Sequence, residues 1–295
     1  MKQVILSQFC TLGLVLLTAG LGCSLSQESV KPKQSAVAEV RPQIVSEEEV
    51  EAEAIARWLN SATSNQPPLV QLRSKGAWGF ENLTFVSEAA ADGEAPILRV
   101  KYPAGSVTPS VSRREGVPIG GAQFYAETDS GARRLRLSYR VRFSDNFDFV
   151  KGGKLPGLFG GEGASGGNIP NGTNGFSTRL MWRREGQGEV YAYLPTSEDF
   201  GTSIGRGRWR FQPGEWTTVE QEVTLNQPGE SDGHIRLWVD GELVIDEPRL
   251  LFRTVDSLQL DGLFFSTFFG GGDASWATPQ DVYVDFADFE MSRVR

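Results

Sequence analysis

The sequence predicts an all-β protein, an antiparallel sandwich preceded by a short N-terminal helix. Three observations carry this prediction. Apolar and polar residues alternate strictly over 134–143, as in a half-buried strand. Asp240-Gly241 separates two short apolar runs, and this dipeptide is a strong β-hairpin signal. From residue 69 onward such runs follow one another with almost no helical pattern, which is typical of a β-sandwich.

The chain begins with a pattern typical of export. Lys2 precedes an apolar run from Val4 to Leu21, which predicts a secretory signal over residues 1–23. The run is close to the length that spans a bilayer, so a membrane anchor is the alternative. The signal's end, TAGLGC, is similar to a bacterial lipoprotein signal, which makes Cys23 a candidate lipid anchor. Cys23 as an ordinary residue of the cleavage region is the alternative there. We expect an exported protein, secreted, periplasmic or on the outer surface, with no membrane-spanning domain in the mature chain.

Residues 24–65 predict a linker followed by one amphipathic helix. Residues 24–42 are polar and contain two prolines, which indicates a flexible linker. Ser46 with Glu49 forms a capping-box pattern, and the following apolar residues share one helical face, which predicts a helix over 46–60. We expect a packing or spacer helix outside the β-domain at 66–295. A chain beginning near Pro67 should therefore fold and stay active.

The strands are expected near eleven stretches of the body. Its length of roughly 225 residues exceeds an immunoglobulin domain and favours a concanavalin-like β-jelly-roll sandwich of two sheets. The expected strands are 78–86, 97–102, 121–127, 134–143, 176–184, 189–194, 217–225, 234–239, 242–246, 258–268 and 281–291.

Composition excludes several classes of function. The 295 residues carry 29 basic and 37 acidic side chains, and this net charge of -8 argues against a nonspecific nucleic-acid binder. One His and two Cys rule out a His/Cys zinc site, and both Cys lie in the leader. We find no cofactor motif and no Asp-rich calcium loop. Acid–base chemistry must come from carboxylates, Tyr or Lys.

Positive charge gathers in one part of this acidic chain. Residues 133–184 hold ten basic and three acidic residues, whereas residues 211–295 hold five basic and sixteen acidic ones. The basic block indicates an anion site, with Arg140 and Arg142 as candidate ligands; a solvated strand face is the alternative. Inside the block, ten of the 25 residues at 151–175 are Gly, which indicates a functional loop that delivers Lys154. No P-loop pattern is present, so we reject a nucleotide site.

The segment after this loop places reactive side chains on one surface. Ser177 and Arg179 are two residues apart, so they share a strand face, and Tyr191 and Tyr193 do the same. Residues 184–188 predict a tight connection between the two strands. If they pair as a hairpin, a hydroxyl, a guanidinium and two phenols lie together, with Lys154 nearby.

Six motifs in order give the chain a family resemblance over roughly residues 70–295. They are KGGKLPGL, SxRLMWR, YxY, FGxSIGRGxWxFxPGxW, VxLNxPGxxDGxIxxWVDG and FSTFFGGGDxSW. The set resembles polysaccharide lyase family 14, the alginate and polyglucuronate lyases. The resemblance implies a β-jelly roll that holds a uronic acid polymer. It also implies a catalytic set, carried over as Lys154, Ser177, Arg179, Tyr191 and Tyr193. Some members have a nearby His, and the loop here has none.

A lyase mechanism is also chemically coherent for these residue types. The enzyme must remove the proton at carbon 5 of a uronate and expel the oxygen at carbon 4. Arg179 and Lys154 can neutralise the carboxylate, and neighbouring cations should favour ionisation of a Tyr that moves the proton. We also expect Arg206 and Trp276 to contact substrate, Trp276 by stacking on a sugar or else as a core aromatic. The expected partner is an acidic polysaccharide.

Two other functions stay open at this stage. A noncatalytic, lectin-like module for acidic glycans would keep the basic face without needing the Tyr pair. A jelly-roll glycoside hydrolase would need two carboxylates facing each other, for which Asp285, Asp288 and Glu290 are candidates. His234 lies far in sequence from the basic block, and we expect it to be dispensable.

Overall fold

The computed structural model describes residues 48–49, 52–61, 70–90 and 93–294, all within one compact unit, Pro42–Arg295. The predicted signal at 1–23, its Cys23 and the linker at 24–42 lie outside the described residues. None of the helices in the described part is both long and apolar enough to span a bilayer.

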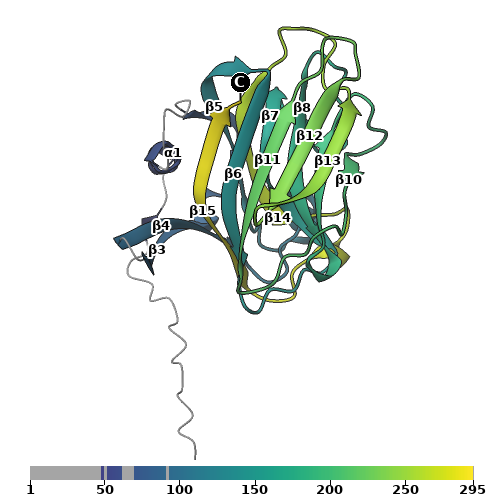
Figure 1. The fold of residues 1–295 in the computed structure, drawn as a ribbon. Helices are drawn as coiled ribbons and strands as arrows, with labels where there is room; N and C mark the ends of the chain where they lie inside the picture. Colours follow the sequence, from purple (N-terminus) through teal and green to yellow (C-terminus); the bar gives the residue numbers. More distant parts are fainter. Residues whose placement is uncertain (1–47, 50–51, 62–69, 91–92, 295) are drawn as a thin grey trace, which may run out of the picture. The chain divides into compact units, whose positions relative to one another are not determined.

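Two antiparallel sheets make up the described domain and confirm the predicted jelly-roll sandwich (Figure 1). The eight-stranded sheet contains, in spatial order, β1 (Glu48–Glu49), β3 (Leu83–Ala90), β4 (Gly93–Tyr102), β15 (Val282–Arg293), β6 (Arg134–Phe143), β11 (Trp216–Thr224), β12 (Gly233–Val239) and β13 (Glu242–Leu250). The seven-stranded sheet contains β10 (Thr202–Ile204), β9 (Gly188–Tyr193), β8 (Gly175–Arg183), β7 (Gly152–Gly161), β14 (Leu260–Phe269), β5 (Ala122–Ala132) and β2 (Val70–Trp78). The helices are α1 (Ala52–Ser61) and α2 (Pro109–Glu115), with 3₁₀ turns η1 (Phe80–Asn82), η2 (Arg184–Gly186) and η3 (Ala274–Trp276).

The alternation at 134–143 becomes β6 residue for residue. Leu135, Leu137, Tyr139, Val141 and Phe143 are all buried in the core, whereas the residues between them are half-exposed. The hairpin signal is confirmed too. Its two turn residues have positive φ, 50° at Asp240 and 81° at Gly241, as a type I′ turn requires.

The N-terminal helix begins later than predicted and belongs to the core. Residues 48–49 pair with β3 as strand β1, so the predicted start at 46 is wrong: this backbone bonds to a strand instead of opening a helix. Ser46, the proposed cap, lies outside the described residues. Ile55, Trp58 and Leu59 of α1 are buried with residues of both sheets. The compact domain therefore includes α1.

The Gly-rich segment is the main error of the sequence prediction. Its first part is β7, a central strand, and only residues 162–174 form a loop. Glycine is needed there for close packing: a Cβ on Gly153 would lie 2.0 Å from Trp182, and one on Gly157 would lie 2.3 Å from the Thr178 carbonyl. Pro156 sits at a bulge, where a strand tolerates a missing N–H.

Candidate active site

The predicted hairpin is formed by β8 and β9, and its register brings the predicted site residues together. Arg179 pairs with Tyr191 and Ser177 pairs with Tyr193. The alternate residues of these strands, such as Leu180 and Val190, enter the core. The five site residues therefore lie on the outer face of the seven-stranded sheet, turned away from the other sheet. We call Lys154, Ser177, Arg179, Tyr191 and Tyr193 the five-residue cluster.

Lys154 projects from β7, not from a loop, which corrects the sequence interpretation. In the register it pairs with Met181 of β8, and its Nζ lies 3.1 Å from the Met181 Sδ. The same Nζ stands 4.6 Å from the centroid of the Tyr191 ring. Burial, together with the nearby guanidinium groups of Arg179 and Arg183, holds the pKa of Lys154 well below its ordinary value. This amine releases its proton more readily than a free lysine.

Arg179 is a buried cation, with 1% of its surface exposed. Its Nη1 donates to Ser266 Oγ at 3.0 Å, and Ser266 donates to Gln123 Oε1 at 3.0 Å. Its guanidinium also lies 4.7 Å from the Phe264 ring centroid, and its Nε has no hydrogen-bond partner. Among the residues that the structure describes, none forms an ion pair with it. Burial lowers the pKa of Arg179 to about 10, so it is still charged at neutral pH.

The two tyrosines meet edge to face, with ring centroids 5.7 Å apart. The Tyr193 hydroxyl accepts a hydrogen bond from the Gly167 backbone N–H at 3.1 Å. Burial and the neighbouring Tyr193 raise the pKa of Tyr191 to about 12, although Arg183 opposes this rise. The sequence predicts that neighbouring cations favour ionisation of one of the two tyrosines, and at Tyr191 burial outweighs the opposing effect of Arg183. Tyr191 keeps its proton at neutral pH.

Ser177 connects the cluster to the loop at 162–174. Its side chain is fully buried, and its hydroxyl donates to the Ala164 carbonyl at 2.6 Å. Ala164 and Gly167 both belong to the loop at 162–174. Ser177 and Tyr193 therefore fix this loop over one end of the cluster.

The family model for polysaccharide lyase 14 matches residues 90–289. The chain belongs to polysaccharide lyase family 14. A marine family 14 alginate lyase from Aplysia kurodai is 35% identical to this lyase. That match covers 74% of this chain and 90% of the other, with a TM-score of 0.63.

Two further alginate lyases share the fold of this lyase at lower identity. Aly36B is 21% identical, with 85% of this chain and 94% of its own covered and a TM-score of 0.67. The lyase vAL-1 from Chlorella virus is 21% identical, with 85% and 100% covered and a TM-score of 0.62. No curated protein matches the chain. The protein is thus a polysaccharide lyase of the alginate lyase type, and its substrate is a polysaccharide.

Sequence reasoning missed one buried carboxylate of the lyase, Glu189. It is fully buried beside the cluster and accepts hydrogen bonds from Arg183 at 2.7 Å, from Arg206 at 2.5 Å and from Ser203 at 2.5 Å. These partners lower its pKa despite the burial. Its position two residues before Tyr191 on the same strand face was the available signal. Glu189 anchors two arginines at the edge of the cluster.

Arg140 and Arg142 do not join the cluster, so the expectation of one shared anion site is wrong. Both lie on β6 of the eight-stranded sheet. Arg140 pairs with Asp288 at 2.5 Å, and Arg142 pairs with Asp285 at 2.8 Å and Glu88 at 3.0 Å. Acidic residues distant in the sequence neutralise this half of the basic block. The predicted alternative, a solvated strand face, fits Arg140, whose side chain is 38% exposed, whereas the Arg142 side chain is 13% exposed within its ion pairs.

The carboxylates considered for a glycoside hydrolase lie on β15 of the eight-stranded sheet, not on the sheet that carries the five-residue cluster. Asp285 is fully buried in ion pairs with Arg99 and Arg142, and Asp288 is held by Arg140. Neither faces the five-residue cluster. Paired carboxylates for hydrolysis are therefore not assembled by these residues.

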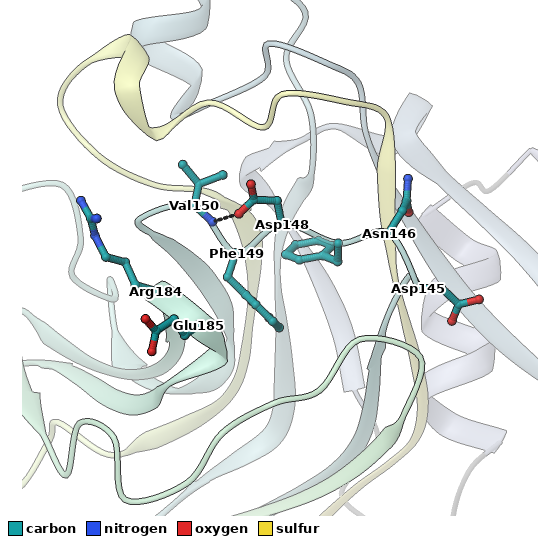
Figure 2. Close-up of a pocket in the computed structure, with 8 residues that line it drawn as sticks. Asp145, Asn146, Asp148, Phe149, Val150, Arg184 and Glu185 are labelled. Carbon is teal, nitrogen blue, oxygen red and sulfur yellow. Dashed lines mark hydrogen bonds between the residues drawn. The ribbon is translucent and has the colours of Figure 1, made fainter. Parts of the chain in front are cut away.

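A cavity of about 550 Å³ adjoins the hairpin end of the lyase but contains none of the five-residue cluster (Figure 2). It is lined by the loop at 145–150 together with Arg184 and Glu185. Asp148 accepts a hydrogen bond from the Val150 backbone at 2.8 Å within it. Arg206 and Trp276 instead line a neighbouring cavity with Arg183. They are close to the cluster but not part of it.

Proposed function

We propose that this lyase cleaves a uronic acid polymer, alginate in the first place, by β-elimination. One observation carries the proposal: Arg179 is a buried cation without an anionic partner among the described residues, and it lies beside an amine and a phenol. A buried charge is costly unless something compensates it. The carboxylate of a uronate supplies that compensation. The substrate of the 35% identical relative, an alginate lyase, supports the same polymer class.

Arg179 acts as the neutraliser. A proton at carbon 5 is weakly acidic until the adjacent carboxylate is stabilised. A fixed guanidinium in a low-dielectric setting stabilises the enolate charge as it develops. Ser266 and Phe264 hold the guanidinium in place, so no reorganisation is needed during the reaction.

Lys154 and Tyr191 divide the proton transfers between them. The lowered pKa of Lys154 suits it to accept the carbon 5 proton, and the raised pKa of Tyr191 suits it to donate a proton. The electron pair of the C–H bond forms the double bond between carbons 4 and 5. The bond from carbon 4 to the glycosidic oxygen breaks, and this oxygen takes the Tyr191 proton. This assignment replaces the sequence-based one, in which a Tyr served as the base.

Tyr193 and Ser177 position the reacting groups. Both are almost fully buried, and both bond to the loop at 162–174. The Tyr193 ring also packs against the edge of Tyr191. We assign them to holding the loop and the donor phenol in place.

The deciding experiment follows the ultraviolet absorbance of the unsaturated uronate formed by elimination. We expect this absorbance to rise when the enzyme is mixed with alginate. Polyglucuronate and a neutral glucan are the other two polymers tested. A hydrolase would release reducing ends without this absorbance. A lectin-like module would bind alginate and form no product. Either result would overturn the proposal.

A further inference from the structure

A cationic cavity opens at the end of the sheet where η2 joins β8 to β9. It measures about 340 Å³, and its lining includes Lys151, Arg183, Arg184, Arg206 and the indole of Trp276. Glu185 also lines it, but this carboxylate is bound by Arg210. The cavity therefore holds a net positive charge, next to an aromatic ring.

This cavity lies in line with the five-residue cluster. Arg183 shares the outer face of β8 with Arg179 and stands four residues further along, roughly 13 Å in an extended strand. That separation is longer than one sugar ring. The Arg183 guanidinium also reaches back to within 5.5 Å of the Tyr191 ring centroid. A polymer whose reacting sugar lies at Arg179 would place another sugar in the cavity.

Glu189 prepares this cavity for an anion. Its buried carboxylate holds Arg183 on one oxygen and Arg206 on the other. The Arg206 Nε donates to Glu189, and the Arg206 side chain is 48% exposed. No described residue accepts a hydrogen bond from its terminal nitrogens, which suit a carboxylate. One face of the Trp276 ring packs against Gly271, and Lys151 Nζ lies 5.7 Å from the centroid of this ring.

The neighbouring cavities have the opposite charge. Beyond Tyr193, a cavity of about 450 Å³ is lined by Glu198, Asp199 and Phe200. The cavity of Figure 2 presents Asp145 and Asp148. Carboxylates repel a polyanion, so of these three cavities only the cationic cavity attracts a polyanion.

We propose that the cationic cavity is a second uronate subsite, in which Arg206, Arg183 and Lys151 bind one carboxylate of the polymer and Trp276 stacks on its sugar. The inference rests on the proposed function. The subsite makes the lyase prefer chains long enough to reach from the five-residue cluster to Trp276, and it orients them with one end toward the hairpin.

The test compares Arg206→Gln with Arg208→Gln on alginate oligomers of increasing length. Arg208→Gln is the control, because it removes the same charge from the same loop. The Arg208 Nη1 donates to the Val244 carbonyl, and Arg208 does not line the cavity. For long oligomers we expect Arg206→Gln to raise KM about three- to tenfold with kcat little changed. For the shortest cleaved oligomers the two variants should match the unmodified enzyme. The KM of Arg206→Gln should also depend less steeply on salt.

Lys151→Gln is a second variant that leaves Glu189 untouched, should Arg206→Gln unfold. It should give the same length-dependent loss. Equal KM values for Arg206→Gln, Lys151→Gln and Arg208→Gln on every oligomer would overturn the second subsite while leaving lyase activity intact. Absence of unsaturated product from the unmodified enzyme would instead overturn the proposed function.

Discussion

Arg179 and Tyr191 are cross-strand partners, and burial shifts their pKa values in opposite directions, to about 10 and about 12. At neutral pH the guanidinium therefore stays charged and the phenol stays protonated. This combination suits a site that stabilises an anion and then protonates a leaving oxygen. It also separates the roles of neighbouring residues, so substitutions at each should give different kinetic results.

Arg179→Lys should retain part of the activity. The ammonium keeps a positive charge but loses the planar fork and the Ser266 contact, so we expect weaker substrate binding and a lower kcat. Arg179→Met should lose about 100-fold or more in kcat, the usual scale for a preorganised charge. Steady-state kinetics on alginate measure both. Arg142→Lys, on the other sheet, is the control; an equal loss there would contradict the assignment.

Lys154→Arg distinguishes a base from a simple neutraliser. Arginine keeps the charge but does not give up its proton under these conditions, so it cannot accept one from carbon 5. We therefore expect a loss of at least about 100-fold in kcat. Near-normal turnover would show that Lys154 only supplies charge. Circular dichroism of the variant should match the unmodified enzyme.

The two tyrosines should differ when each loses its hydroxyl. Tyr191→Phe removes the proposed proton donor, so kcat should fall about 100-fold or more while binding of alginate persists. Tyr193→Phe removes the acceptor for the Gly167 N–H, so we expect a smaller loss of kcat and a lower Tm. The reverse ranking would move the donor role to Tyr193.

The pH profile of kcat/KM should have an alkaline optimum. Activity rises as Lys154 loses its proton, at a pH below the ordinary lysine value because its pKa is lowered. Activity falls again from about pH 10, where Arg179 loses its charge, and falls further as Tyr191 loses its proton near pH 12. His234→Gln is the control, because His234 lies on β12 of the other sheet, bonded to Asp246 at 2.5 Å. An optimum on the acid side of neutrality would contradict this assignment.

The sequence was sufficient where a local pattern determines the structure. Period-two alternation defined β6, and the spacing of Ser177, Arg179 and the tyrosines predicted a hairpin surface that the register confirms. Strand β7 was missed because its glycines are explained by packing against residues distant in the sequence, such as Trp182, 29 residues from Gly153, and not by local turn chemistry. Local charge counting likewise failed at Arg142, since its partner Asp285 is 143 residues away. Which sheet a strand joins is a long-range property.

The same limitation explains why the N-terminal helix is less dispensable than its sequence indicates. Trp58 is 7% exposed, and its Nε1 donates to the Pro96 carbonyl at 3.2 Å. Its ring meets Phe85 and Phe289 edge to face, at 5.7 and 5.4 Å. Removal of residues up to Pro67 would expose this surface, so we expect a lower Tm and not the tolerated deletion that the sequence predicts.

Trp58→Ala should cost about 3–5 kcal/mol of unfolding free energy, the usual range for a buried tryptophan. Arg57→Ala, at the exposed neighbouring position of the same helix, should change it by less than about 0.5 kcal/mol. Denaturant titration measures the unfolding free energy of both variants. Elimination kinetics at low temperature measure whether the active site of the folded variant is intact. Because α1 packs against β2 and the hydrophobic core, whereas the five-residue cluster lies on β7, β8 and β9, folded Trp58→Ala should cleave alginate at a normal rate. Equal stability of the two variants would show that the helix is a spacer after all.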